Sequence, residues 1–139
     1  MTLGAAISAS FIFNVIIILF VVYWVGNQLY LYIQRRRVGK EITEEVFNKG
    51  MRKAQIVDLR EPKDFDSGHI LGARNLPYSQ LTQQYTDLRA DLPIYLYDQG
   101  RTLSTRAAIK LYRKGYRNLY WLKKGYQNWD GKTKSKKHV

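Results

Sequence analysis

The first 34 residues of the chain carry no charged side chain. No Asp, Glu, Lys or Arg occurs before Arg35, and residues 11–25 are almost entirely apolar, with Asn14 as the exception. A helix of about 20 apolar residues crosses the hydrocarbon core of a bilayer, and residues 3–24 supply that length. Residues 1–34 are therefore predicted to form one transmembrane helix with an interfacial extension. The lipid bilayer is its first expected partner.

Three consecutive arginines set the expected orientation of this helix. Arg35, Arg36 and Arg37 follow the apolar stretch directly and begin a basic linker, predicted over residues 35–41. Because basic residues are retained on the cytoplasmic side, we expect a cell-membrane protein with its N-terminus outside and the remainder in the cytoplasm. A cleaved signal peptide is the alternative, but the segment lacks a basic start and its apolar run is too long.

Composition limits the chemistry of the rest of the chain. With 139 residues there is room for one small globular domain beside the helix. The absence of cysteine excludes disulfides, thiolate metal ligands, persulfides and thiol nucleophiles. No His, Cys, Asp and Glu cluster has the spacing of a metal site, so we expect neither metal nor cofactor.

The formal net charge of +12 predicts an acidic partner. Nucleic acid is not expected, because the chain is tethered to a membrane and contains no recognised binding motif. The C-terminal residues 132–139 are predicted to be a basic disordered tail. Anionic lipid is the expected contact of five basic residues, Arg35, Arg36, Arg37, Lys136 and Lys137. A solvated tail with no partner is the alternative.

From Ile42 onward the sequence alternates short β-rich runs with helical patterns. Strands are expected at residues 55–59, 74–76, 93–97 and 118–122, and helices at 43–49, 61–66, 79–88, 102–114 and 126–129. Strands separated by helices of this length predict a central parallel sheet covered on both faces, an α/β three-layer sandwich over residues 42–131. The functional site of such a sheet lies beyond the carboxyl ends of its strands, which places it after Tyr97.

Four motifs follow one another in this part of the chain. They are Asp58-Leu59-Arg60 after a strand, Gly68-His69-Ile70-Leu71-Gly72-Ala73-Arg74-Asn75-Leu76-Pro77, a loop and helix from Tyr97 to Ala107-Ala108, and Leu122-Lys123-Lys124-Gly125-Tyr126-Gln127-Asn128-Trp129. This succession resembles the rhodanese-like domain family over residues 42–129. Lys124 stands where the family has the first glycine of Leu-x-Gly-Gly-x-x-x-Trp.

The resemblance implies a specific site loop. In the family the residue that ends the central strand is the catalytic cysteine, and an ungapped count back from Ala107-Ala108 places Asp98 there. The loop that would surround the reactive atom is then Gln99, Gly100, Arg101, Thr102, Leu103 and Ser104. Backbone N–H groups at the start of a helix form an anion cradle, which in active members of the family holds the sulfur.

Asp98 excludes the usual chemistry of this loop, because a carboxylate cannot form a persulfide. We expect its carboxylate to accept hydrogen bonds from loop N–H groups or to pair with Arg101, filling the cradle. A nucleophilic Asp98 in an acyl-phosphate mechanism is a weaker alternative, because that chemistry needs a metal and no second acid follows at a useful spacing. A cradle that still binds an anionic or peptide ligand is the third interpretation.

Three further residues resemble family positions near the loop. Asp58 and Arg60 are predicted to form an ion pair that ties the strand end to the next helix, rather than to transfer protons. His69 is predicted to be a hydrogen-bonded packing residue rather than a ligand.

The sequence therefore predicts a single-pass, membrane-anchored, catalytically inactive rhodanese-like domain that acts as a cytoplasmic binding or scaffolding module. We expect its partners among other membrane or cytoplasmic proteins. The alternative is an enzyme that uses the same cradle, either phosphatase-like or transferring sulfur with a partner's thiol.

Overall fold

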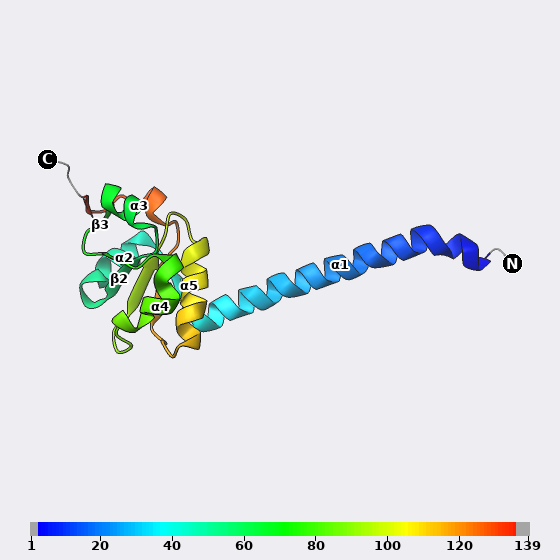
Figure 1. Cartoon of the computed structure of the whole chain (residues 1–139), viewed down its shortest axis with the longest axis horizontal. Coiled ribbons are helices and arrows are strands. Elements are labelled where there is room, and N and C mark those ends of the chain that lie inside the picture. Colours follow the sequence, from blue (N-terminus) through cyan, green and yellow to red (C-terminus); the bar gives the residue numbers. More distant parts are fainter. Residues whose placement is uncertain (1–2, 136–139) are drawn as a thin grey trace. The chain divides into compact units, whose positions relative to one another are not determined.

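The computed structural model describes residues 3–135, with side chains from Ser8 onward, and divides the chain into two units at Gln34 and Arg35. The first unit consists of most of helix α1 (Leu3–Val38) (Figure 1). From Ser8 this helix is long and apolar enough to cross a bilayer, with a mean hydropathy of 2.3 in a window that the protein does not bury. The prediction of one long apolar N-terminal helix is confirmed.

The second unit contains a five-stranded parallel sheet. Its strand order is β1 (Lys40–Ile42), β6 (Leu119–Leu122), β5 (Ile94–Tyr97), β2 (Gln55–Asp58) and β4 (Arg74–Asn75). All four residues of the central strand β5 are buried, which suits a strand covered on both faces. Its carboxyl end, after Tyr97, is the position at which sites form in such sheets.

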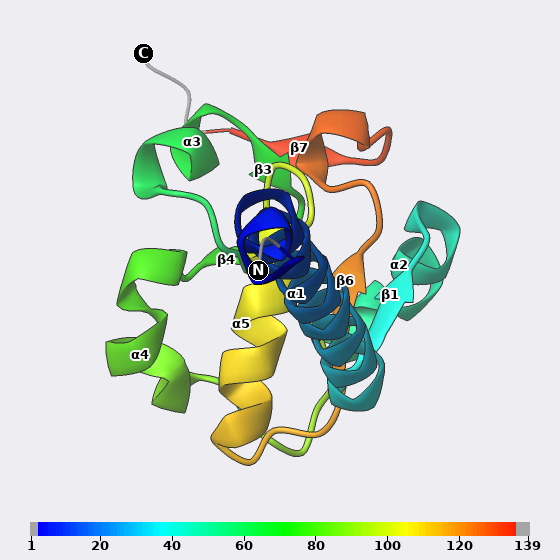
Figure 2. The same cartoon turned by 90° about the vertical axis from the view of Figure 1, so that its right-hand side faces the viewer.

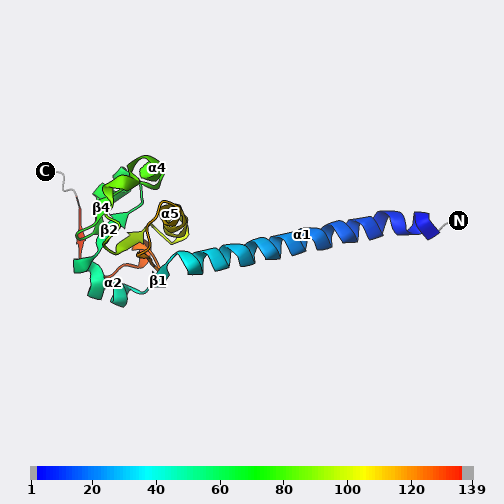
Figure 3. The same ribbon diagram turned by 90° about the horizontal axis from the view of Figure 1, so that it is seen from below.

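Alternate residues of β5 enter two different cores. Ile94 and Leu96 pack with Leu81 of α4 (Leu81–Gln84) and Leu111 of α5 (Thr102–Arg113). Tyr95 and Tyr97 point to the opposite face, where the second core includes Phe47 of α2 (Glu44–Gly50). Figure 3 shows α4 and α5 on one side of the strands and α2 on the other. The predicted α/β three-layer sandwich with a central parallel sheet is therefore confirmed.

Short helical segments complete the second unit. Thr43 caps α2 by accepting a hydrogen bond from the N–H of Val46 at 3.4 Å. The remaining helical segments are η1 (Met51–Lys53), α3 (Pro62–Ser67), η2 (Tyr78–Gln80), η3 (Tyr85–Asp87) and η4 (Tyr126–Asn128). The single helix predicted over residues 79–88 is instead η2, α4 and η3. No side chain caps these turns, and β-branched Thr82 and Thr86 weaken a continuous α-helix.

The predicted linker over residues 35–41 is wrong. Residues up to Val38 belong to α1, and Val38 is 2% exposed in the core of the second unit. Lys40 and Glu41 then enter strand β1, which pairs with β6. Lys and Glu are poor strand formers, so pairing with β6 rather than their own preference accounts for this strand.

The predicted disorder of residues 132–139 is also wrong in part. Thr133 and Lys134 form strand β7, which pairs antiparallel with β3 (His69–Ile70) (Figure 2). The N–H of Leu71 extends this pairing by donating to the carbonyl of Lys132 at 3.0 Å. Lys136 and Lys137, expected to contact anionic lipid, lie outside the described residues.

Candidate functional site

The loop between β5 and α5 is organised around the carboxylate of Asp98. Asp98 is 4% exposed and directly follows the central strand. Its Oδ2 accepts a hydrogen bond from the N–H of Leu103 at 3.2 Å, and its Oδ1 accepts one from the hydroxyl of Ser104 at 2.5 Å. The residue at the N-cap position, Arg101, makes no capping bond with its side chain. Asp98 therefore supplies the oxygen acceptor that an N-cap residue usually gives to the start of a helix.

This carboxylate also suits the electrostatics of the helix. The N-terminus of α5, a helix of 12 residues, carries a partial positive charge that a nearby anion stabilises. Both donors described above point to the protein's own carboxylate rather than into open space. The loop thus contains the protein's own carboxylate at the start of α5.

Of the two interactions expected for the Asp98 carboxylate, the hydrogen bond from a loop N–H group is present and the pair with Arg101 is not. The Arg101 Nη1 instead lies 3.0 Å from Oε1 of Glu41 in β1. The Arg101 side chain is largely exposed, so this ion pair contributes little to stability. Glu41 is 60 residues from Arg101 in the sequence, and it approaches the loop because β1 pairs with β6.

The rest of the loop is held by its backbone. The carbonyls of Asp98 and Gln99 accept hydrogen bonds from the N–H groups of Tyr126 at 2.9 Å and Gln127 at 3.3 Å. Gly125 precedes this contact with a φ of +68°, and a Cβ atom there would overlap the carbonyl oxygens of Gly100 and Gln99. Glycine at this position therefore lets segment 125–127 approach the loop closely.

Lys124, by contrast, replaces the first glycine of the family motif without backbone strain. No residue other than glycine has a positive φ among those described, so the backbone at Lys124 accepts a side chain. Its side chain is exposed. The turn accommodates Lys124 because the second glycine, Gly125, is the residue that approaches the carbonyl oxygens of the loop closely.

Asp58 and Arg60 form a buried pair at the end of β2. The Arg60 Nη2 lies 2.7 Å from Asp58 Oδ2, and the Arg60 backbone N–H donates to Asp58 Oδ1 at 2.9 Å. The same Nη2 donates to the carbonyl of Gly68 at 2.6 Å, at the end of α3. The guanidinium also lies 4.2 Å from the centroid of the Tyr126 ring. The pair thus joins the strand end, α3 and the segment that supports the loop.

The ionisation of this cluster is fixed by its surroundings. Burial lowers the pKa of Arg60, but the hydrogen bond and charge of Asp58 raise it to a net value above normal. Burial, and then the negative charge of Asp58, raise the pKa of Tyr97 far above its usual value. The Tyr97 hydroxyl accepts a hydrogen bond from the N–H of Ile70 at 3.0 Å. These shifts keep Arg60 charged and Tyr97 neutral at the end of β2.

His69 and Asn75 complete the supporting layer. The His69 ring stacks on Phe65 with centroids 3.7 Å apart, and its Nδ1 lies 2.7 Å from the Phe65 carbonyl. Asn75 donates through Nδ2 to the carbonyls of Asp58 at 3.1 Å and Arg60 at 2.8 Å. Asn75 lies within the Gly-Ala-x-Asn-x-Pro motif, but the sequence alone does not indicate this role. Among the described residues, no group of His, Cys, Asp and Glu side chains could hold a metal ion.

Comparison with known proteins agrees with this architecture. The model of the rhodanese-like domain matches residues 43–132. The chain is 44% identical over 129 residues to the uncharacterized protein YqhL of Bacillus subtilis, covering 93% of this chain and 99% of that protein. It is 30% identical over 94 residues to the thiosulfate sulfurtransferase GlpE of Ectopseudomonas mendocina, covering 68% and 84% of the two chains.

Solved structures show the same fold. The crystal structure of a rhodanese-like domain protein from Staphylococcus aureus superposes with a TM-score of 0.64 at 20% identity, covering 70% of this chain and 99% of that one. The BH2092 protein of Bacillus halodurans also gives a TM-score of 0.64, at 21% identity, covering 80% and 87%. Together with the family match, these similarities show that the chain belongs to the rhodanese-like domain family.

Proposed function

We propose that the protein is a single-pass, membrane-anchored rhodanese-like domain that has lost sulfurtransfer and serves as a binding or scaffolding module. The observation that carries the proposal is Asp98, whose two carboxylate oxygens accept bonds from Leu103 and Ser104 inside the loop. No cysteine is present anywhere in the chain to carry a sulfane sulfur. A domain that keeps the fold and fills its reactive position with an internal anion is suited to recognition rather than catalysis.

An enzyme built on the same loop has less support. A phosphatase-like reaction would need an accessible oxygen of Asp98 to attack phosphorus, but Asp98 is 4% exposed and its carboxylate is held by Leu103 and Ser104. No second acid occurs in the loop or in α5. Sulfur transfer with a partner's thiol would require an anionic sulfur donor to enter a site that holds a buried carboxylate, which repels it.

The proposed location is the cell membrane, with the N-terminus outside and the domain in the cytoplasm. Support comes from Arg35, Arg36 and Arg37 in the last turn of α1 and from the lack of any charge earlier in the chain. Protease added to sealed cells is expected to spare the domain and to degrade it after the membrane is opened. Cleavage of the domain in sealed cells would overturn this orientation.

The loss of sulfurtransfer is tested with the full-length protein purified in mild detergent. Thiocyanate formation from thiosulfate and cyanide is expected to equal the uncatalysed rate for the parent and for Asp98→Ala. The matched Asp98→Cys variant restores a thiol at the same position and reports whether the assay detects sulfurtransfer in this loop. A parent rate above the uncatalysed reaction, in protein free of other sulfurtransferases, would contradict the proposal.

A further inference from the structure

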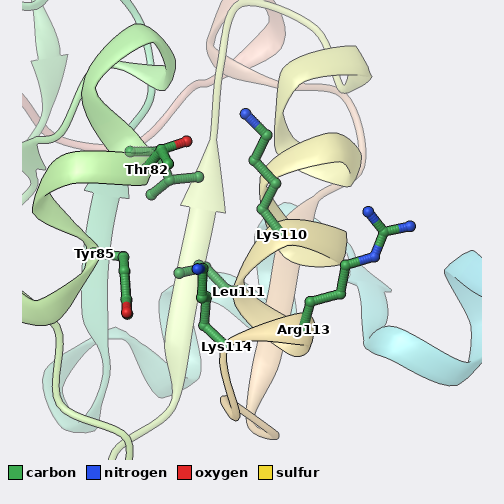
Figure 4. Close-up of a pocket in the computed structure, with 7 residues that line it drawn as sticks. Thr82, Tyr85, Lys110, Leu111, Arg113 and Lys114 are labelled. Atoms are coloured by element: carbon green, nitrogen blue, oxygen red, sulfur yellow. The ribbon is translucent and has the colours of Figure 1, made fainter.

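A pocket of about 300 Å³ lies between α4 and α5, and none of its residues belongs to the loop around Asp98. Leu81 and Leu111 contribute a buried apolar floor, whereas Thr82 is exposed at the side of α4. Figure 4 shows Thr82 and Tyr85 on one side of the pocket and Lys110, Leu111 and Lys114 on the other. Its lining residues are Leu81, Thr82, Tyr85, Lys110, Leu111, Arg113 and Lys114.

The edge of the pocket is cationic. Nζ of Lys110 lies 4.4 Å from the centroid of the Tyr78 ring, and Nζ of Lys114 lies 5.2 Å from the centroid of the Tyr85 ring. Lys110 belongs to α5 and Lys114 directly follows it, and both ammonium groups lie over tyrosine rings of the segment 78–85. The rings orient these cations without neutralising them.

The described residues supply no counter-ion for these cations. No acidic side chain lines the pocket, and none of the ion pairs among the described residues involves Lys110, Arg113 or Lys114. Three basic residues, Lys110, Arg113 and Lys114, line the pocket. Such an uncompensated field attracts an anionic ligand.

We propose that this pocket docks an acidic peptide segment of a partner protein, in which carboxylates flank one large apolar side chain. The apolar anchor would lie on Leu81 and Leu111, and the flanking carboxylates would pair with Lys110 and Lys114. A pocket of this volume suits one anchor side chain. The inference rests on the proposed binding function and assigns it a surface and a class of partner.

The shape of the site favours a peptide over a membrane surface. An anionic bilayer would satisfy the charges of Lys110 and Lys114, but its head groups carry no apolar side chain for the recess between α4 and α5. An acidic peptide with an apolar anchor satisfies both the charged edge and the apolar floor. The combination of charge and concavity therefore favours the acidic peptide.

The test uses full-length protein in nanodiscs of neutral phosphatidylcholine. Three random peptide libraries are compared: Asp or Glu around one Leu or Phe, the same with Asn or Gln replacing the acids, and the same with Ser replacing the apolar residue. Only the first library is expected to yield binders. The charge-reversed double variant Lys110→Glu/Lys114→Glu should weaken those binders at least tenfold.

Two further variants separate the pocket from general charge. Thr82→Trp fills the pocket without changing charge and should weaken the same peptides at least tenfold. The matched double variant Lys123→Glu/Lys124→Glu makes an equal charge change at exposed residues outside the pocket and should change affinity less than twofold.

Three results would overturn the proposal. The first is the absence of binders in the acidic library, and the second is an equal loss of affinity in the Lys123→Glu/Lys124→Glu control. The third is protection of Lys110 and Lys114 from an amine reagent by phosphatidylglycerol nanodiscs that the selected peptides do not displace, which would assign the site to lipid. Thiocyanate formation tests the proposed loss of sulfurtransfer separately, so the two proposals fail independently.

Discussion

The hydroxyl of Ser104 donates a 2.5 Å hydrogen bond to the carboxylate of Asp98, and both side chains are buried. Asp98 directly follows the central strand β5 and Ser104 lies in the first turn of α5, so the bond joins the two ends of the loop. The motif count predicts that Asp98 occupies the position of the family's catalytic cysteine. In this chain the interaction forms a structural connection between strand and helix.

Substitutions of Asp98 and Ser104 should be energetically coupled. Ser104→Ala leaves the buried carboxylate with one donor and should lower the free energy of unfolding by about 1–3 kcal/mol. Asp98→Asn should cost a similar amount, and the double variant should cost clearly less than the sum. Urea unfolding of a fragment beginning at Arg35 measures the cycle. Additive effects of the two substitutions would show that the bond does not link them.

The buried pair of Asp58 and Arg60 should be far more sensitive than the exposed pair of Arg101 and Glu41. Arg60→Met leaves the fully buried Asp58 uncompensated and should cost about 3–5 kcal/mol. Arg101→Met should cost less than about 1 kcal/mol, because its pair is exposed. The same unfolding measurement compares the two variants. Equal losses would contradict the structural role assigned to Arg60.

Alkaline pH should destabilise the domain through Tyr97. Because its folded pKa lies far above its unfolded value of about 10, the stabilisation is complete below that pH and declines as the pH rises above it. At neutral pH the free energy of unfolding of Tyr97→Phe should be lower by about 1 kcal/mol, because the variant lacks the hydroxyl that accepts the hydrogen bond from Ile70. It should then show a shallower decline of stability above about pH 10. Parallel curves for parent and variant would refute this assignment.

Gly125 and Gly100 should respond differently to alanine. Gly125→Ala forces a side chain into a left-handed conformation and against the loop carbonyls, and it should cost at least about 2 kcal/mol. Gly100→Ala meets no atom within 4 Å and should change stability by less than about 0.5 kcal/mol. Thermal melting of both variants makes the comparison. Tolerance of Gly125→Ala would mean that the loop does not require this close approach.

The sequence predicts the elements whose signal is local. The apolar run of β5, the apolar stripe of Ala107, Ala108 and Leu111 in α5, and the charge-free N-terminal segment each determine their structure through their own residues. Strands β1 and β7 cannot be predicted from local sequence, because they contain only three and two residues. They depend on pairing with β6 and β3.

The same distinction applies to the site. The position of Asp98 follows from the motif count, and its bonds to Leu103 and Ser104 are close in sequence. The partner of Arg101 is Glu41, from a distant strand, so only the tertiary structure reveals it. The α4–α5 pocket joins residues of two separate helices that share no motif, which explains why no sequence pattern indicated it.

Binding of thiosulfate to the full-length protein in detergent, measured by isothermal titration calorimetry, tests most directly whether Asp98 occupies the anion position of the loop. No saturable binding by the parent is expected at millimolar thiosulfate. Asp98→Ala should bind it, because the N–H of Leu103 and the hydroxyl of Ser104 then lose their internal acceptor. Thiosulfate binding by the parent that is as tight as binding by Asp98→Ala, or no binding by either protein, would contradict this account.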